Sequence, residues 1–376
     1  MSLYLIKGEC LCQRNPKDRL FEPQRQANVI EGLVLLIAFG AILGLVILVH
    51  ELGHFAAACA SQVRIEELGI GLPPRLVRLG SFWGAEISLN WIPLGGFVRP
   101  AGEFDPSVPD GLAAGPLLAR IGILSAGSLA NLLLAVLLMT AAFMAGWPDQ
   151  VEVLLVEAGS PAAAAGLLPA DKILSANGDL VREAGELRNL LEASAGAPVL
   201  LEVERGTQIL ETTIKPRTDP PEGHGPAGFT STGVLVRYEL LPAFTRAIEK
   251  VAHLLTATVQ ITADALTPGE RDSSVRLSSP LGLKQASDQA MRNASDWEEP
   301  FPVLYLAAWL SLAVAMTNIL PLPALDGGRI LMVLIEAIRA RRMDPKVEKW
   351  IHALGMVGLL VLVIVLTARD AIDPLF

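Results

Sequence analysis

Four long apolar runs constrain this chain more than any other feature of its sequence. A helix needs about 20 apolar residues to cross a hydrocarbon core of roughly 30 Å, and each run reaches or approaches that length. The runs occupy residues 32–60, 121–147, 301–325 and 352–368. Composition agrees, because 52% of the 376 residues are hydrophobic and only 18% are charged, values typical of membrane proteins. We therefore expect an α-helical membrane protein with about four transmembrane helices in a lipid bilayer.

The charge balance excludes nucleic acid as a partner. The formal net charge is −9, and no basic stripe is present that could neutralise phosphates. Three cysteines are too few for a disulfide scaffold. Cys10 and Cys12 form a C-x-C pair, but a zinc site needs further ligands, so two ordinary thiols are the simpler interpretation.

The segments around the first two runs have distinct compositions. Residues 1–30 are polar and lack helical periodicity, which predicts either a mobile leader or a start assigned too early, without a function in either case. No small-residue cleavage site follows the first run, so we expect a retained helix rather than a signal peptide. Within the first half of the core, residues 31–149, the segments 63–71 and 86–98 are β-branched and aromatic and are broken by Gly and Pro. They predict a membrane-associated β-hairpin.

The second half of the chain begins with a soluble insertion. Residues 150–216 predict a small α+β domain, because Asn177-Gly178 and the segment 199–214 are typical of β-hairpins. Residues 217–299 are expected to hold a linker and an amphipathic helix at 242–266, which either lies on a membrane surface or packs as an ordinary helix. Residues 300–376 would complete the core with two transmembrane helices.

Basic residues predict the orientation in the membrane. The loop between the third and fourth runs is rich in them and is therefore expected to be cytoplasmic. These residues are Arg329, Arg339, Arg341, Arg342, Lys346 and Lys349. With four spans, the loop after the first helix is then cytoplasmic, and the α+β domain and both termini face outside. The leader opposes this orientation, since it also carries five basic residues, namely Lys7, Arg14, Lys17, Arg19 and Arg25.

The first run contains the pattern H-E-x-x-H. Positions i and i+4 lie on one helix face, so the imidazoles of His50 and His54 can reach one Zn²⁺. Glu51 can then act as general base toward an attacking water while the metal polarises the scissile carbonyl. The alternative is two polar histidines at a helix end, but ionisable groups within an apolar helix are costly unless they have partners. About eighteen helical residues separate Gly32 from His50, roughly 27 Å, which places the site within the thickness of the membrane.

A catalytic zinc site usually has three protein ligands. Asp326 is the best supplier of the third, because it follows a hydrophobic run in which Pro321 and Pro323 interrupt regular helix and allow the chain to turn inward. The alternative role for Asp326 is the N-cap of a helix over residues 328–342. Spacing alone does not decide between these roles.

Two motifs together resemble a known family. They are His50-Glu51-x-x-His54 in the first run and Asn318-x-x-Pro321-x-Pro323-x-Leu325-Asp326-Gly327 in the third. The pair is similar to the site-2 protease family of intramembrane zinc metalloproteases, in particular its bacterial RseP-type members. The similarity continues through residues 92–98 and 276–282, and residues 159–178 resemble part of a PDZ domain. It covers nearly everything from residue 31 to the C-terminus.

The resemblance implies a zinc-dependent endopeptidase that cuts single-span membrane proteins after a site-1 type protease has removed the outer domain of the substrate. It implies one Zn²⁺ per chain, with His50, His54 and Asp326 as ligands and Glu51 as catalytic base. Asn318 corresponds to a position that holds substrate, although a buried hydrogen bond between helices is an equally open role.

Further substrate contacts are expected at the hairpin and at the prolines. Gly95 and Gly96 lie in the segment 92–98, which corresponds to a membrane-dipping hairpin that could bind substrate as an added strand. Pro321 and Pro323 flank the proposed third ligand. All four are predicted substrate-binding residues.

Two departures from the family pattern are present. Members often carry Gly-Pro-x-x-Asn in the second span, where this chain has Gly127-Ser128-Leu129-Ala130-Asn131, so we expect a local difference in helix geometry that leaves the proposed ligands untouched. RseP-type members often have two PDZ domains, and one is expected here. We expect it to act as a sieve against bulky outer domains, with peptide capture as the alternative.

The predicted function is intramembrane proteolysis in the cytoplasmic (inner) membrane, with an anti-sigma factor or a remnant signal peptide as substrate. The active site would lie toward the cytoplasmic side, and the PDZ-like domain would be extracytoplasmic. One alternative is a catalytically idle PDZ-containing membrane scaffold, which the intact Glu51 disfavours. Another is a zinc protease of the prenyl-protein-processing type, which shares H-E-x-x-H but lacks the Asp326 motif.

Overall fold

The computed structural model describes residues 16–221, 225–266, 282–285, 287–288, 290–291 and 299–372. The Cys10/Cys12 pair and residues 276–281 lie outside this range. The chain divides into two compact units. Unit 1 comprises Met1–Ser128, Arg276–Met291 and Thr317–Phe376, and unit 2 comprises Leu129–Val275 and Arg292–Met316.

Within the described residues, four helices are long and apolar enough to cross a membrane, by length and composition. The candidate spans are Leu33–Ala60 within α1 (Pro16–Ala60), α2 (Leu117–Ala145), α7 (Phe301–Ile319) and α9 (Pro345–Ile372). They correspond to the four apolar runs. The third helix ends at Ile319 rather than at residue 325, because the prolines that follow cannot continue a helix.

Helix α1 begins earlier than expected. It starts at Pro16, inside the segment predicted to lack helix. Proline is well tolerated at the first helical position, and the Lys, Arg, Gln and Glu residues that follow are good helix formers. Extending an existing helix is far less costly than starting one, so no apolar periodicity is needed to prolong the helix toward the N-terminus.

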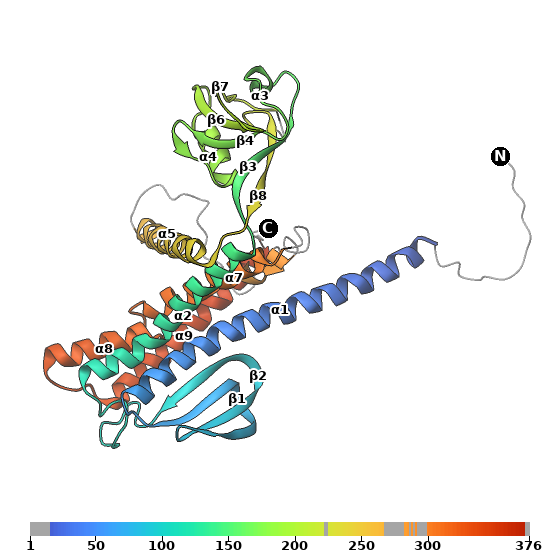
Figure 1. Cartoon of the computed structure of the whole chain (residues 1–376). Helices are drawn as coiled ribbons and strands as arrows, with labels where there is room; N and C mark the ends of the chain where they lie inside the picture. The colour runs from blue at the N-terminus through green and yellow to red at the C-terminus, as the bar shows by residue number, and fades with distance from the viewer. Residues whose placement is uncertain are drawn as a thin grey trace, which may run out of the picture. The chain divides into compact units, whose positions relative to one another are not determined.

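The expected β-hairpin is present in unit 1 as β1 (Ile65–Phe82) and β2 (Ala85–Pro100), which Figure 1 shows beside α1. The first part of β1 pairs on both sides, since Glu67 lies opposite both Arg99 and Glu86. The Glu67 carboxylate is buried and accepts hydrogen bonds from Ser88 at 2.7 Å, Arg75 at 2.7 Å and Arg99 at 2.9 Å. Burial acts to raise the pKa of this carboxyl, but these donors hold it below its usual value.

The core of unit 1 joins the end of α1, the hairpin, the start of α2 and helix α8 (Asp326–Arg339). Its buried members are Phe55, Ala58, Val63, Ile65, Leu68, Ala85, Leu112, Ile123, Leu124 and Val333. Polar contacts also fix α8. Arg120 pairs with Glu336 at 2.7 Å, and Arg329 pairs with Glu103 at 2.9 Å. Arg329, one of the basic residues that predict the orientation, therefore also has a structural role.

Unit 2 contains a mixed domain at residues 147–236, which we call the β domain. Its sheet has the strand order β7-β6-β4-β3-β8, with β5 paired to β4. The strands are β3 (Trp147–Val156), β4 (Lys172–Ala176), β5 (Asp179–Leu180), β6 (Val199–Arg205), β7 (Gln208–Ile214) and β8 (Phe229–Val236). The helices are α3 (Pro161–Ala164) and α4 (Ala184–Ala193).

Both hairpins predicted in the β domain are confirmed. Asn177 and Gly178 have φ values of 53° and 87° and connect β4 to β5, as the turn preference of this pair requires. Strands β6 and β7 form the second hairpin. The domain extends beyond residue 216, because β8 lies in the expected linker region and pairs along β3.

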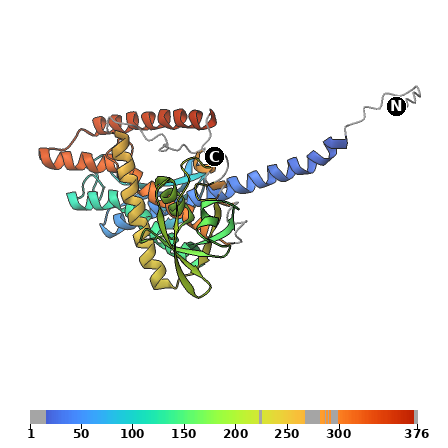
Figure 2. The same cartoon turned by 90° about the horizontal axis from the view of Figure 1, so that it is seen from above.

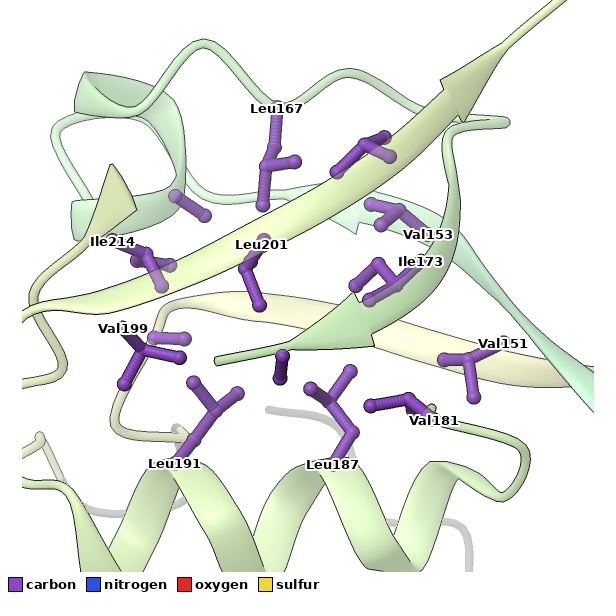
Figure 3. Packing of buried hydrophobic residues seen from close by; sticks show 14 residues of the cluster. Val151, Val153, Leu167, Ile173, Val181, Leu187, Leu191, Val199, Leu201 and Ile214 are labelled. Carbon is purple, nitrogen blue, oxygen red and sulfur yellow. The ribbon is translucent and has the colours of Figure 1, made fainter. Parts of the chain in front are cut away.

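The core of the β domain lies between the sheet and α4. Figure 3 shows Leu187 and Leu191 of α4 facing Val199 and Leu201 of β6. Leu187, Leu201 and Val199 are among the largest fully buried side chains of the described residues. Burial of each such side chain contributes about 1.5–3 kcal/mol, so this helix is an integral part of the domain.

Helix α5 (Leu240–Leu266) has two apolar faces. Ala243, Ala247 and Val251 are buried and share a core with Trp147 and Phe301. A second stripe is exposed, formed by Leu241, Phe244 and Ile248. Lys250 of this helix pairs with Glu183 of the β domain at 2.5 Å, and Figures 1 and 2 both show α5 next to that domain. The first face confirms the packed-helix alternative, while membrane contact of the second face stays a prediction.

The Asp171–Arg205 pair should stabilise the β domain. Arg205 donates to both carboxylate oxygens of the buried Asp171 at 2.7 Å, and the Leu168 N–H donates at 2.8 Å. We expect D171N to lower the free energy of unfolding by about 2 kcal/mol. Substitution E192Q in the exposed Arg188–Glu192 pair should lower it by no more than about 0.5 kcal/mol. Hydrogen exchange of β6 and β7 amides in the whole protein measures both, and equal effects would contradict the assignment.

The Asp171–Arg205 pair also predicts that the stability of the β domain depends on pH. Burial raises the pKa of the Asp171 carboxyl, but the bonds from Arg205 and Leu168 outweigh this and hold it below the ordinary value of 3.8. A carboxyl with a depressed folded-state pKa stabilises fully above the unfolded-state pKa and loses that contribution as the pH falls. The difference in free energy of unfolding between the wild type and D171N should therefore shrink below about pH 4.

Candidate metal centre

Two histidines of α1 face one another. His50 and His54 are one helical turn apart, their rings are edge to face with centroids 4.7 Å apart, and their Nε2 atoms are separated by 3.1 Å. His50 is almost fully buried. The geometry follows from the i, i+4 spacing, which needs no other part of the fold.

The carboxylate of Asp326 completes a triangle with these nitrogens. Its Oδ2 atom lies 3.0 Å from His50 Nε2 and 3.1 Å from His54 Nε2. Asp326 is the first residue of α8, and the N-cap is Leu325, so the N-cap role that the sequence left open does not belong to Asp326. Its position is compatible with metal ligation and with favourable charge at a helix N-terminus.

A close approach of chain segments delivers Asp326 to the histidines. After α7 ends, the chain turns through Ala324, whose φ is 76°. At Gly327, a Cβ atom would lie 2.2 Å from the carbonyl oxygen of Ile319, and at Gly328 it would lie 2.1 Å from that of Leu322. Only glycine allows this contact, so both glycines are required for the turn.

The three donor atoms suit a zinc ion. They all lie within 4.8 Å of one another, and their separations of 3.0–3.1 Å approach the value of about 3.3 Å expected for tetrahedral ligands with bonds of about 2.0–2.1 Å. The Nδ1–H group of His54 donates to the Ile123 carbonyl oxygen at 2.7 Å. That bond selects the tautomer whose Nε2 lone pair faces the centre, the usual support for a metal-ligating histidine.

Helix α2 covers the histidines at Gly127. A Cβ atom at this position would lie 2.5 Å from His54 Nε2 and 2.7 Å from His50 Nε2. The absence of a side chain therefore leaves the space in which a bound metal would lie. Gly127 opens the motif that lacks the proline of the family pattern, but its closeness to the histidines could not be derived from the sequence.

Glu51 points to the β-hairpin. Its Oε2 accepts a hydrogen bond from the backbone N–H of Val98 at 2.9 Å. Gly96 lies beside it, with an ideal Cβ position 3.5 Å from Glu51 Cγ, while Gly95 lies next to Ile47 and has a φ of 81°. The structure thus brings two of the predicted substrate-binding residues close to the predicted base. Val98 is a contact that sequence spacing could not reveal.

The other predicted substrate-binding residues lie where α7 ends. Asn318 is half-buried in the last turn of α7, Pro321 is exposed and Pro323 is half-buried. All three therefore belong to the segment that leads to Asp326. Their roles in substrate binding stay predictions.

Comparison with known proteins identifies the family of this chain. Residues 38–362 match peptidase family M50. The match covers most of the chain, which therefore belongs to this family of site-2 proteases.

The similar relatives have consistent names. A protein of Clostridium perfringens, named as a candidate zinc metalloprotease, is 30% identical over 343 residues, which cover 90% of this chain and 98% of the relative. A probable chloroplast membrane metalloprotease of Arabidopsis thaliana is 30% identical, with 99% and 88% covered. Metalloprotease MmpA of Caulobacter vibrioides is 29% identical, with 85% and 91% covered.

Two solved PDZ domains resemble a part of the chain. They come from Listeria monocytogenes and Listeria innocua and are 24% and 25% identical, with TM-scores of 0.21 and 0.20. Each covers 22% of this chain.

The closeness of Gly127 to the histidines yields a test. We expect G127A to weaken zinc binding at least tenfold, because the added methyl group would overlap the imidazole nitrogens. Gly122 lies on the same helix, and beyond its own turn no atom of the described residues lies within 4 Å of its ideal Cβ position, so G122A should bind zinc as the wild type does. Competition with a chelator in detergent measures both affinities. Unchanged affinity in G127A would contradict the proposed metal position.

Proposed function

We propose that this chain is a zinc-dependent intramembrane endopeptidase that cleaves single-span membrane proteins. The observation that carries the proposal is the position of His50, Glu51 and His54 within the candidate span Leu33–Ala60. His50 follows about 26 Å of helix from the start of that span. Membership of family M50 and the names of the relatives support zinc and a membrane location.

Each residue of the centre has a proposed role. His50, His54 and Asp326 hold one zinc ion, which when bound would polarise the scissile carbonyl and acidify a water molecule. Glu51 takes the proton of the attacking water and passes it to the leaving amine. The Val98 N–H holds one oxygen of Glu51, which orients the carboxylate for this transfer.

The β-hairpin is the proposed substrate platform. Residues 96–100 of β2 pair with residues 65–70 of β1, and Val98 in this segment contacts Glu51. An unwound transmembrane segment could pair with the edge of the hairpin as an added strand. Gly95 and Gly96 are proposed to let the hairpin pack closely against α1. Asn318, Pro321 and Pro323 are proposed to contact substrate beside Asp326.

The β domain is proposed to exclude substrates that still carry a bulky outer domain, so that a site-1 type cleavage must come first.

A second candidate role of the β domain is peptide capture. A groove of about 570 Å³ is lined by α4, the segment 225–227 and β8, and β8 is the last strand in the order of the sheet. A groove beside an edge strand suits an added peptide strand. If exclusion is the main role of the β domain, a substrate that is not cleaved while it carries its outer domain should be cleaved once that domain is removed.

The proposed location is the cytoplasmic membrane, with the metal centre toward the cytoplasmic side and the β domain outside. Exposed Arg339 and Arg341 support this orientation. Anti-sigma factors and remnant signal peptides are the proposed substrates.

Orientation can be tested with cysteines. In a chain whose own cysteines are replaced, D179C at the start of the exposed strand β5 should react with a membrane-impermeable maleimide in intact cells. R341C should react only after permeabilisation. The reverse pattern would overturn the orientation and leave the chemistry unaffected.

The mechanism predicts separate effects at the base and at the third ligand. E51Q should retain zinc but cleave tagged remnant signal peptides at least 100-fold more slowly, because it lacks a general base. D326N should lose zinc. A chelator should stop wild-type cleavage in detergent.

Three outcomes would count against this function. Equal cleavage by the wild type and E51Q would exclude the mechanism, whereas no cleavage by the wild type would favour an idle membrane scaffold. Unchanged zinc content in D326N would exclude Asp326 as a ligand.

A further inference from the structure

A histidine outside the metal triangle contacts the turn that carries Asp326. His352 lies in α9, and its Nδ1 atom accepts a hydrogen bond from the backbone N–H of Ala324 at 3.1 Å. Ala324 precedes Asp326 by two residues and has a φ of 76°. A residue with a Cβ rarely adopts this conformation, which costs about 1–2 kcal/mol, so the surrounding contacts must hold it in place.

A second contact from the same helix reaches the same turn. Gly355 follows His352 by three residues and therefore lies on the same face of α9. A Cβ atom at Gly355 would lie 2.4 Å from Pro323 Cβ and 2.7 Å from the Pro323 carbonyl oxygen. The helix thus meets the turn closely through a glycine and binds it through a histidine, one helical turn apart.

The start of α8 also packs closely against this turn. Gly327 and Gly328 lie against carbonyl oxygens of residues 319, 320 and 322. The backbone around Asp326 is therefore restrained both by the segment that leaves α7 and by α9. With the backbone restrained in this way, the carboxylate has little freedom to leave the two imidazoles.

The environment of His352 argues against a role in packing alone. Its Nε2 atom is buried and has no hydrogen-bond partner among the described residues, an arrangement that costs about 1–3 kcal/mol. The ring lies 6.0 Å from that of Phe104. An apolar side chain would fill this place without an unsatisfied nitrogen, but it could not accept the Ala324 N–H.

We propose that His352, together with Gly355, is a positioning residue that holds the Pro323–Ala324 turn so that Asp326 reaches the metal. The proposal rests on the assignment of Asp326 as a zinc ligand. His352 itself touches neither metal nor substrate in this role. It acts through its acceptor nitrogen and the backbone of Ala324.

Three substitutions at His352 separate hydrogen bonding from volume. H352N places an oxygen near the former Nδ1 position and should keep zinc affinity within about threefold of the wild type. H352F fills the space without an acceptor, and H352Q places its acceptor near the Nε2 position. Both should weaken zinc binding by about 10–100-fold, the range observed when partners of metal ligands are lost. Chelator competition in detergent measures the affinities.

A spectroscopic signature distinguishes altered ligation from a general loss of stability. The Co²⁺-substituted wild type and H352N should share one visible absorption spectrum. H352F should show a different spectrum, because Asp326 no longer reaches the metal fully. The thermal unfolding midpoint of H352F should stay close to that of the wild type. Wild-type zinc affinity and an unchanged Co²⁺ spectrum in H352F would overturn the proposal, as would equal damage in H352N and H352F.

Substitution of Gly355 provides an independent test of the positioning role, with a matched control on the same helix. G355A should weaken zinc binding, since its methyl group would push against Pro323. Gly358 lies one turn further along α9, where no described residue outside that turn places an atom within 4 Å of the ideal Cβ position, so G358A should leave zinc affinity unchanged. Equal affinities in G355A and G358A would overturn the role of Gly355.

A comparison with D326N separates this proposal from the proposed function. If D326N keeps its zinc, the ligand assignment itself fails. If D326N loses zinc while H352F and G355A bind it normally, the ligand assignment stands and only the positioning role is overturned.

Discussion

The structure of unit 1 depends on one constraint, which is that two imidazoles and a carboxylate meet within 3.1 Å among apolar helices. Polar groups in such surroundings are costly unless they satisfy one another or bind a common partner. Helix α1 supplies His50 and His54 through local spacing alone. Asp326 must be brought to them by tertiary structure, and the break between α7 and α8, the glycines around it and the contacts of α9 all serve that approach.

The local part of the centre was predictable from sequence, and the tertiary part was not. H-E-x-x-H specifies its own geometry on any helix. The prolines before Asp326 make it a candidate ligand, but its distance along the chain carries no spatial information, so only the family resemblance decides between ligation and an N-cap role. Gly127, Val98 and His352 contact the site or its support through packing between distant segments. No periodicity or motif marks such contacts, so only the folded structure reveals them.

The same division applies to the rest of the fold. Four apolar runs were sufficient to locate the helices, and Asn177-Gly178 was sufficient to locate a turn, since both signals act within a few residues. The end of the β domain was missed because β8 becomes a strand by pairing with β3, which lies more than one hairpin away. Composition also could not show which face of α5 packs. The buried face carries mainly alanines, whereas the larger apolar residues Leu241, Phe244 and Ile248 are exposed.

The glycines around the candidate metal centre change what a mutational scan would measure there. Replacement by alanine normally removes atoms, and its effect is taken as the contribution of the side chain that was lost. At Gly127, Gly327, Gly328 and Gly355 the same replacement adds a methyl group where an imidazole, a carbonyl oxygen or a proline ring already lies. These positions therefore belong among the most informative in the chain, although a scan that passes over glycine would leave them untested.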